Sequence, residues 1–161
     1  ILEPDFLRGL GSLQAFDLTY DLLLYPNHLS YAVEAVKQFP EQKFVLDHIA
    51  KPLIKDGTLT PWDEDIRELA KLENVYCKVS GMVTEASWKQ WKAADFKPYL
   101  DIVFDCFGPE RLMFGSDWPV STLSANYNQV HSIVWDYIQQ YPAQVQEKIL
   151  GMNAVEFYGI T

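Results

Sequence analysis

The 161-residue sequence predicts an α/β fold with a parallel sheet. Four short apolar segments have the composition of buried strands, and a segment with helical periodicity follows each of them. The strands begin about 25 to 36 residues apart, which leaves room for the helix that a parallel connection requires. We therefore expect a single domain over residues 1–161, with an opening helix, four strand–helix units, and closing helices over residues 124–141 and 143–158.

The opening helix and the first strand are expected near the N-terminal end. Apolar side chains recur at helical spacing over residues 3–16, with a proline in the first turn, where proline is tolerated. Residues 18–25 (LTYDLLLY) then form a strand, which the following proline ends. Alternation places Asp21 and Tyr25 opposite an apolar face. The apolar face is expected to contact helices, and the polar face suits a barrel lumen or a cleft.

The second unit ends its strand on a histidine. Residues 28–39 carry a helical apolar stripe that a proline stops, and residues 43–48 (KFVLDH) form the next strand. His48 therefore lies at the carboxyl end of a parallel strand, where α/β proteins place binding and catalytic groups. The alternative is a histidine whose hydrogen bonds are satisfied within the core.

The third strand carries a lysine. After a helix over residues 62–72, the strand at residues 75–81 (VYCKVSG) alternates between an apolar face and a face with Lys78 and Ser80. A lysine on a central strand is costly unless it faces water or an opposite charge. We expect Lys78 to pair with Asp21 or with a substrate carboxylate, or else to extend into solvent at a sheet edge.

The fourth strand ends on an acid. Residues 82–96 are polar and aromatic, as in a long loop over a site, and residues 97–107 form a helix. Residues 111–118 (RLMFGSDW) form a buried strand, which is expected to end at Asp117 or Trp118 because the following proline lacks the N–H that a central strand donates. The alternative for Asp117 is an acid that caps the next helix.

Composition and motifs exclude several classes of protein. The formal net charge of −9 argues against a nucleic-acid or anionic-membrane surface, because both favour clusters of lysine and arginine. No apolar stretch approaches the roughly 20 residues of a membrane span, and the start shows no leader pattern. Two cysteines are too few for a disulfide framework, so a reducing cytoplasm is expected. The sequence also lacks the glycine-rich nucleotide loops, the GxSxG elbow and the HExxH motif, which argues against nucleotide cofactors, serine hydrolases and zincin proteases.

Five stretches carry a resemblance to a known family: residues 18–26 (LTYDLLLYP), 44–52 (FVLDHIAKP), 79–82 (VSGM), 112–119 (LMFGSDWP) and 151–160 (GMNAVEFYGI). They resemble the amidohydrolase-related TIM-barrel hydrolases, most closely the branch of sugar lactonases and pyrone-dicarboxylate lactonase. The resemblance implies that the four strands are the fifth to eighth of a (β/α)8 barrel, with the first four outside this sequence. A half-barrel has two open strand edges, so we expect self-association or pairing with the missing N-terminal half.

The resemblance also implies roles for residues at the strand ends. His48 matches the histidine that ends strand six, and Asp117 matches the catalytic aspartate that ends strand eight. Tyr25 falls where metal-binding relatives have a histidine, and a phenol is a poor substitute for imidazole on zinc. The resemblance therefore implies either no metal or one divalent ion, zinc or manganese, on His48 and Asp117. Lys51 and Trp118 match positions that line the substrate pocket.

These expectations favour hydrolysis of a small-molecule substrate, a sugar-derived or dicarboxylic lactone, by water that Asp117 activates. His48 would polarise the lactone carbonyl. The expected substrate-binding residues are Tyr25, Lys51, Lys78, Ser80 and Trp118. One alternative keeps the divalent metal and gives a metal-dependent amide hydrolase or a decarboxylase. Another is a catalytically silent half-barrel, either a scaffold or a fragment.

Overall fold

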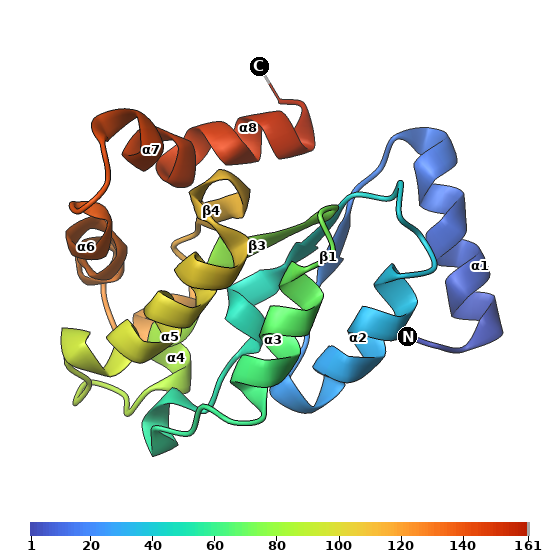
Figure 1. The fold of residues 1–161 in the computed structure, drawn as a ribbon. Helices are drawn as coiled ribbons and strands as arrows, with labels where there is room; N and C mark the ends of the chain where they lie inside the picture. Colours follow the sequence, from blue (N-terminus) through green and yellow to red (C-terminus); the bar gives the residue numbers. More distant parts are fainter. Residues whose placement is uncertain (161) are drawn as a thin grey trace.

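The computed structural model describes residues 1–160 and contains one four-stranded parallel sheet with helices packed on it (Figure 1). The strands lie side by side in chain order: β1 (Tyr20–Leu22), β2 (Phe44–Leu46), β3 (Val75–Val79) and β4 (Leu112–Phe114). The register pairs Tyr20 with Phe44, Phe44 with Val75, and Cys77 with Leu112. The prediction of an α/β fold with four parallel strands is confirmed.

Helices precede, connect and follow the strands. They are α1 (Pro4–Leu13), α2 (Leu29–Val36), α3 (Trp62–Ala70), α4 (Met82–Glu85), α5 (Ala93–Phe107), α6 (Tyr127–Ile138), α7 (Ala143–Glu147) and α8 (Asn153–Tyr158). A π-helical turn at Lys148–Met152 joins α7 to α8 where a single helix was expected. Over residues 1–160, no helix is both long enough and apolar enough to cross a bilayer.

All four strands are shorter than the sequence predicts. β3 ends at Val79 rather than at residue 81, and Gly81 has a φ of 64°. β1 covers only three residues of the predicted segment 18–25. β2 ends at Leu46 rather than His48, because His48 has a φ of 54°. β4 ends at Phe114 rather than at Asp117 or Trp118, because Asp117 has a φ of 54° and cannot continue an extended strand. The polar side chains therefore lie on turns just beyond the strands.

The segment at residues 82–96, expected to be an irregular loop, is partly helical. It contains α4, and α5 begins at Ala93 rather than at residue 97. The earlier start has a local cause, because the Asp95 carboxylate accepts a hydrogen bond from the Lys92 N–H at 2.8 Å. Such an N-terminal acceptor satisfies a backbone donor that the helix leaves without a partner.

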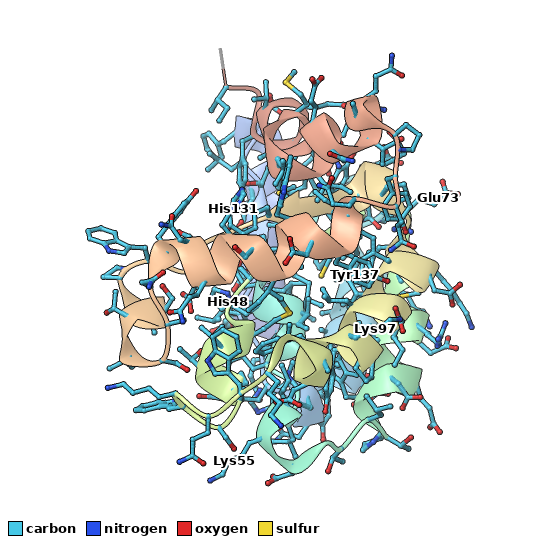
Figure 2. The ribbon with its side chains drawn as sticks, turned by 90° about the vertical axis from the view of Figure 1, so that its left-hand side faces the viewer. His48, Lys55, Glu73, Lys97, His131 and Tyr137 are labelled. Atoms are coloured by element: carbon cyan, nitrogen blue, oxygen red, sulfur yellow. The ribbon has the colours of Figure 1, made fainter. Side chains whose placement is uncertain are left out.

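One face of the sheet carries the main hydrophobic core. Phe44, Cys77, Val79 and Leu112 point into it and are fully buried. Helices α2, α3 and α5 lie along this face in Figure 1, as strands linked by helical crossovers require. Figure 2 looks onto α6, where the Tyr137 hydroxyl donates to the Asp101 carboxylate of α5 at 2.8 Å.

A second, smaller core lies on the other face of the sheet. Val45 of β2 and Met113 of β4 are buried there against Phe157 of α8, which is 2% exposed. Tyr76 of β3 joins them, with its ring 4.8 Å from that of Phe157. Helix α8 therefore covers part of this face, while the turns after the strands remain available for chemistry.

Removing the Phe157 ring should test how far this second core stabilises the sheet. We expect Phe157→Ala to lower the free energy of unfolding by about 3–5 kcal/mol, because a buried ring is lost and a cavity remains. Val155→Ala on the same helix is the control, since Val155 is 36% exposed and its truncation should change stability by less than about 0.5 kcal/mol. Urea denaturation measures both, and equal losses would contradict a second core.

Candidate active site

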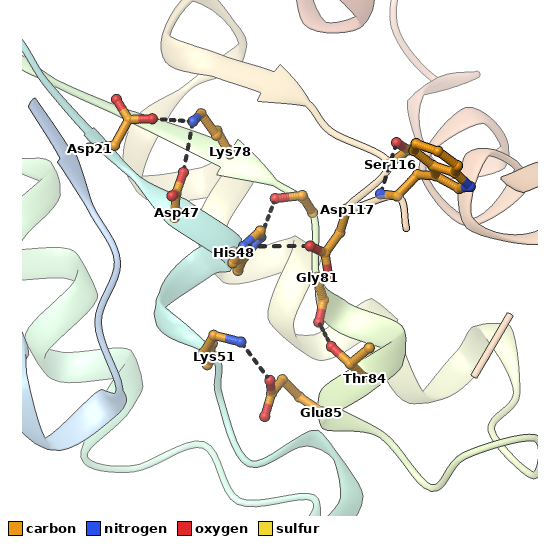
Figure 3. A network of polar contacts seen from close by, with 12 residues as sticks. Asp21, Asp47, His48, Lys51, Lys78, Gly81, Thr84, Glu85, Ser116 and Asp117 are labelled. Carbon is orange, nitrogen blue, oxygen red and sulfur yellow. Dashed lines mark hydrogen bonds and ion pairs between the residues drawn. The ribbon is translucent and has the colours of Figure 1, made fainter. Parts of the chain in front are cut away.

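Three polar side chains meet beyond the carboxyl ends of three neighbouring strands (Figure 3). His48 follows β2, Ser80 follows β3 and Asp117 follows β4. His48 Nδ1 lies 2.8 Å from Ser80 Oγ, which is a hydrogen bond. His48 Nε2 lies 3.7 Å from Asp117 Oδ1. That gap is too long for a direct hydrogen bond but allows one oxygen atom to contact both groups.

A left-handed turn gives His48 its direction. Residues 48–51 all have positive φ, at 54°, 47°, 61° and 50°. The Lys51 N–H closes the turn on the His48 carbonyl at 2.8 Å. The left-handed region costs roughly 1–2 kcal/mol for each non-glycine residue, so the surrounding structure must hold the turn. Ile49 and Ala50 are fully buried and supply part of that hold.

Two glycines make room for the cluster. Gly81 has a φ of 64°, and a Cβ on it would lie 2.7–2.8 Å from atoms of the His48 side chain. A Cβ on Gly115 would lie 3.0 Å from Ser80 Cβ. Both glycines thus permit a close approach that other residues would prevent. Neither glycine was assigned a role from the sequence, although Gly81 directly follows the polar residue Ser80.

The surroundings keep His48 neutral near pH 7. Burial lowers the pKa of the His48 imidazole below its ordinary value, and nearby Lys51 and Lys78 act in the same direction. The carboxylates of Asp117 and Asp47 oppose this shift. A neutral imidazole donates from one nitrogen and accepts at the other, so the ring can serve Ser80 and a bound oxygen at once.

Lys78 lies between two carboxylates beside this cluster. Its ammonium donates to Asp21 and lies 2.8 Å from Asp47 Oδ1. The Tyr158 hydroxyl of α8 donates to Asp21 Oδ2 at 3.1 Å. Burial opposes the charge, yet the bonds to Asp21 and Asp47 prevail and raise the pKa of Lys78. A substrate group would have to compete with these carboxylates for the lysine.

The remaining predicted site residues lie at the edge of the cluster. Lys51 pairs with Glu85 at 3.1 Å, and its ammonium lies 5.9 Å from the centre of the Tyr25 ring. Tyr25 and Trp118 are 57% and 69% exposed. The structure therefore brings His48, Ser80 and Asp117 together, holds the two lysines in ion pairs, and leaves the two aromatic side chains open to a ligand.

The described residues do not form a complete metal site. His48 and Asp117 are two ligands of suitable type, but catalytic zinc normally takes three protein ligands. Within residues 1–160, no group of three or more histidine, cysteine, aspartate or glutamate side chains is placed to hold a metal ion. The donors of this chain would need at least one more from elsewhere.

Comparison with known proteins identifies the sequence family. A family model described as Amidohydrolase matches residues 2–160. L-fucono-1,5-lactonase of Burkholderia multivorans is 43% identical in a match covering 98% of this chain and 57% of that protein. The enzyme of the same name from Burkholderia ambifaria is 34% identical, with 99% and 55% covered. The chain thus spans little more than half the length of these relatives.

Solved structures show the same relationship. An amidohydrolase from Burkholderia multivorans, crystallised with bound HEPES, superimposes with a TM-score of 0.93 at 38% identity. The match covers 99% of this chain and 59% of that one. A second crystal form of that amidohydrolase holds zinc and superimposes equally well, with a TM-score of 0.93.

The close packing of Gly81 against His48 can be tested with a matched pair of glycines. Gly57 has a φ of 65°, close to that of Gly81, but a Cβ on it would meet nothing within 4 Å. We expect Gly81→Ala to lower the free energy of unfolding by about 1–3 kcal/mol more than Gly57→Ala, because only the former displaces the imidazole. Denaturation of the two variants measures the difference, and equal losses would show that the ring is not held there.

Proposed function

The chain belongs to the amidohydrolase family, and from this we propose that it forms part of a lactonase, an enzyme that hydrolyses cyclic esters. The observation that carries the proposal is the 3.7 Å gap between His48 Nε2 and Asp117 Oδ1. One oxygen atom in that gap can contact a carboxylate and a neutral imidazole together. The names of the relatives at 43% and 34% identity support a lactone as substrate.

We propose further that residues 1–161 form one domain that is the second half of an eight-stranded barrel. The family members matched here are longer, since the chain covers 57% of the first relative. Within residues 1–160, the outer edges of β1 and β4 have no strand beside them. Open edges favour further pairing, with the rest of the polypeptide or with a second copy.

In the proposed reaction, Asp117 is the general base. Its carboxylate takes a proton from water as the water oxygen bonds to the lactone carbonyl carbon. The ring C–O bond then breaks, and the proton returns to the departing alkoxide oxygen to give the hydroxy acid. Asp117 is suited to this task because its side chain is 11% exposed, which limits solvent competition for the carboxylate.

His48 supports the charge that develops on the carbonyl oxygen. For this role Nε2 carries the proton and donates to that oxygen, while Nδ1 accepts from the Ser80 hydroxyl. The low pKa of His48 keeps the ring in this neutral form. Tyr25 and Trp118 at the exposed edge would contact the hydroxyls and the ring of the substrate, and Tyr25 would hydrogen-bond the leaving alkoxide.

The charges favour a neutral sugar lactone over a dicarboxylic one. Lys78 is compensated by Asp21 and Asp47, and Lys51 by Glu85. A dicarboxylate would bring two further negative charges close to these acids, which repel it. A neutral polyol lactone instead offers hydroxyl groups, which can hydrogen-bond to the lysines and the carboxylates alike.

The second candidate is a metal-dependent hydrolase, which the zinc-containing structure at 38% identity favours. His48 and Asp117 would be two of the ligands, and the missing half would supply the others. Elemental analysis of the dialysed full-length protein distinguishes a metal-free lactonase from a metal-dependent hydrolase. The metal-free lactonase predicts less than about 0.1 equivalent of zinc or manganese with full activity, whereas one equivalent and loss of activity on chelation favour the metal enzyme.

The proposed base is tested by Asp117→Asn in the full-length protein. We expect kcat/KM for a neutral aldono-lactone to fall roughly 10²–10⁴-fold, because the amide cannot accept the proton from water. A pH indicator follows acid release. Asp136→Asn, at an exposed carboxylate on α6, should leave the rate unchanged.

Two comparisons extend this assay. The neutral aldono-lactone should be hydrolysed faster than a pyrone dicarboxylate, and the reverse order would contradict the charge argument. The 161-residue chain alone should be inactive, because it would form only half of the proposed barrel.

If Asp117→Asn keeps its activity within about tenfold of the wild type, Asp117 is not the general base.

A further inference from the structure

The left-handed turn at residues 48–51 is held by a residue that lies outside the site. Trp62, the first residue of α3, donates from its indole Nε1–H to the Ile49 carbonyl at 2.8 Å. Trp62 is 2% exposed and Ile49 is fully buried, so water does not compete for this bond. The indole is therefore a direct hydrogen-bond link between the helical layer and the turn that carries His48.

The turn depends on such a link because its backbone is strained. Four successive non-glycine residues in the left-handed region together cost several kcal/mol, at roughly 1–2 kcal/mol each. The Lys51 N–H bond to the His48 carbonyl lies within the turn and does not fix it relative to the sheet. The Ile49 carbonyl, if left without a donor, would be a buried acceptor with no partner, which favours a different backbone path.

Trp62 is itself fixed by its neighbours. The ring of Tyr99, from α5, lies 5.3 Å from the Trp62 ring. The Tyr99 hydroxyl donates to the carbonyls of Leu53 and Thr58 at 3.3 and 3.1 Å. A continuous set of packed and hydrogen-bonded groups thus runs from α5 through the indole to the turn. A rigid support of this kind is what a well-oriented imidazole requires.

We propose that Trp62 is a positioning residue for His48. Its indole N–H fixes the Ile49 carbonyl, and the fixed turn directs the imidazole toward Ser80 and Asp117. The role in turnover rests on the lactonase function proposed above, whereas the orientation of His48 does not. Trp62 is buried, and its indole bonds to the turn rather than to His48 or Asp117, so its effect on the site passes through the turn.

The test is Trp62→Phe in the full-length protein, with two readouts. The phenyl ring retains most of the buried apolar contact and loses the donor. We expect kcat for a neutral lactone to fall about 10–100-fold, as for other supports of functional groups, with KM changed less than about threefold. Loosening the turn should also disturb the hydrogen bond between His48 Nδ1 and Ser80 Oγ, which is 2.8 Å long. The ¹⁵N resonances of the labelled His48 imidazole should therefore shift, and NMR measures this without any substrate.

A control of similar energetic cost separates positioning from simple destabilisation. Ile66→Val removes one buried methyl group from the same helix and should cost about 0.5–1.5 kcal/mol. Its side chain makes no hydrogen bond to the turn, so kcat and the His48 imidazole resonances should stay as in the wild type. If Trp62→Phe also leaves both unchanged and lowers only the thermal midpoint, the proposal is wrong.

Rescue at Ala50 tests the turn directly. Ala50 has a φ of 61°, and glycine adopts this conformation without steric cost. The double variant Trp62→Phe/Ala50→Gly should therefore recover the wild-type His48 imidazole resonances and at least about a third of the loss in log kcat. This variant also serves if Trp62→Phe alone does not fold. A folded double variant with no recovery would overturn the proposal. Shifted His48 imidazole resonances on Trp62→Phe substitution in a protein without lactonase activity would uphold it and reject the function instead.

Discussion

The site depends on a reversal of backbone handedness directly after β2. If the strand continued past Leu46, successive side chains would point to opposite faces of the sheet. Two neighbouring residues could then not both face the same site. The left-handed turn at residues 48–51 removes that constraint and directs His48 toward the ends of β3 and β4. Its stability comes from full burial of Ile49 and Ala50 and from the indole of Trp62.

The charged side chains beside the site are paired with one another. The face of the sheet that carries the site also carries Asp21, Asp47 and Lys78, which form one network instead of isolated buried charges. Pairing of this kind offsets much of the cost of removing the three ions from water. Because Lys78 is already compensated, it adds little net positive potential for an anionic ligand. The imidazole of His48 stays neutral beside it.

Much of the fold was accessible from the sequence because it depends on periodicity. The four strands, their order and the acidic end near Asp117 follow from apolar runs and their spacing. The strand ends were placed too late, since nothing local to His48 or Asp117 reveals a positive φ in a non-glycine residue. The contacts of Gly81 and Trp62 with the turn depend on packing between segments distant in sequence, which alternation alone does not encode.

We propose that His48 and Asp117 act as one chemical unit across a gap of 3.7 Å. A double-mutant cycle on kcat/KM in the full-length protein, with His48→Asn and Asp117→Asn, measures their coupling. We expect the double variant to lose about as much activity as the worse single variant, as groups that share one step do. If the two losses multiply, so that their free energies add, the two side chains act independently and the proposed unit is wrong.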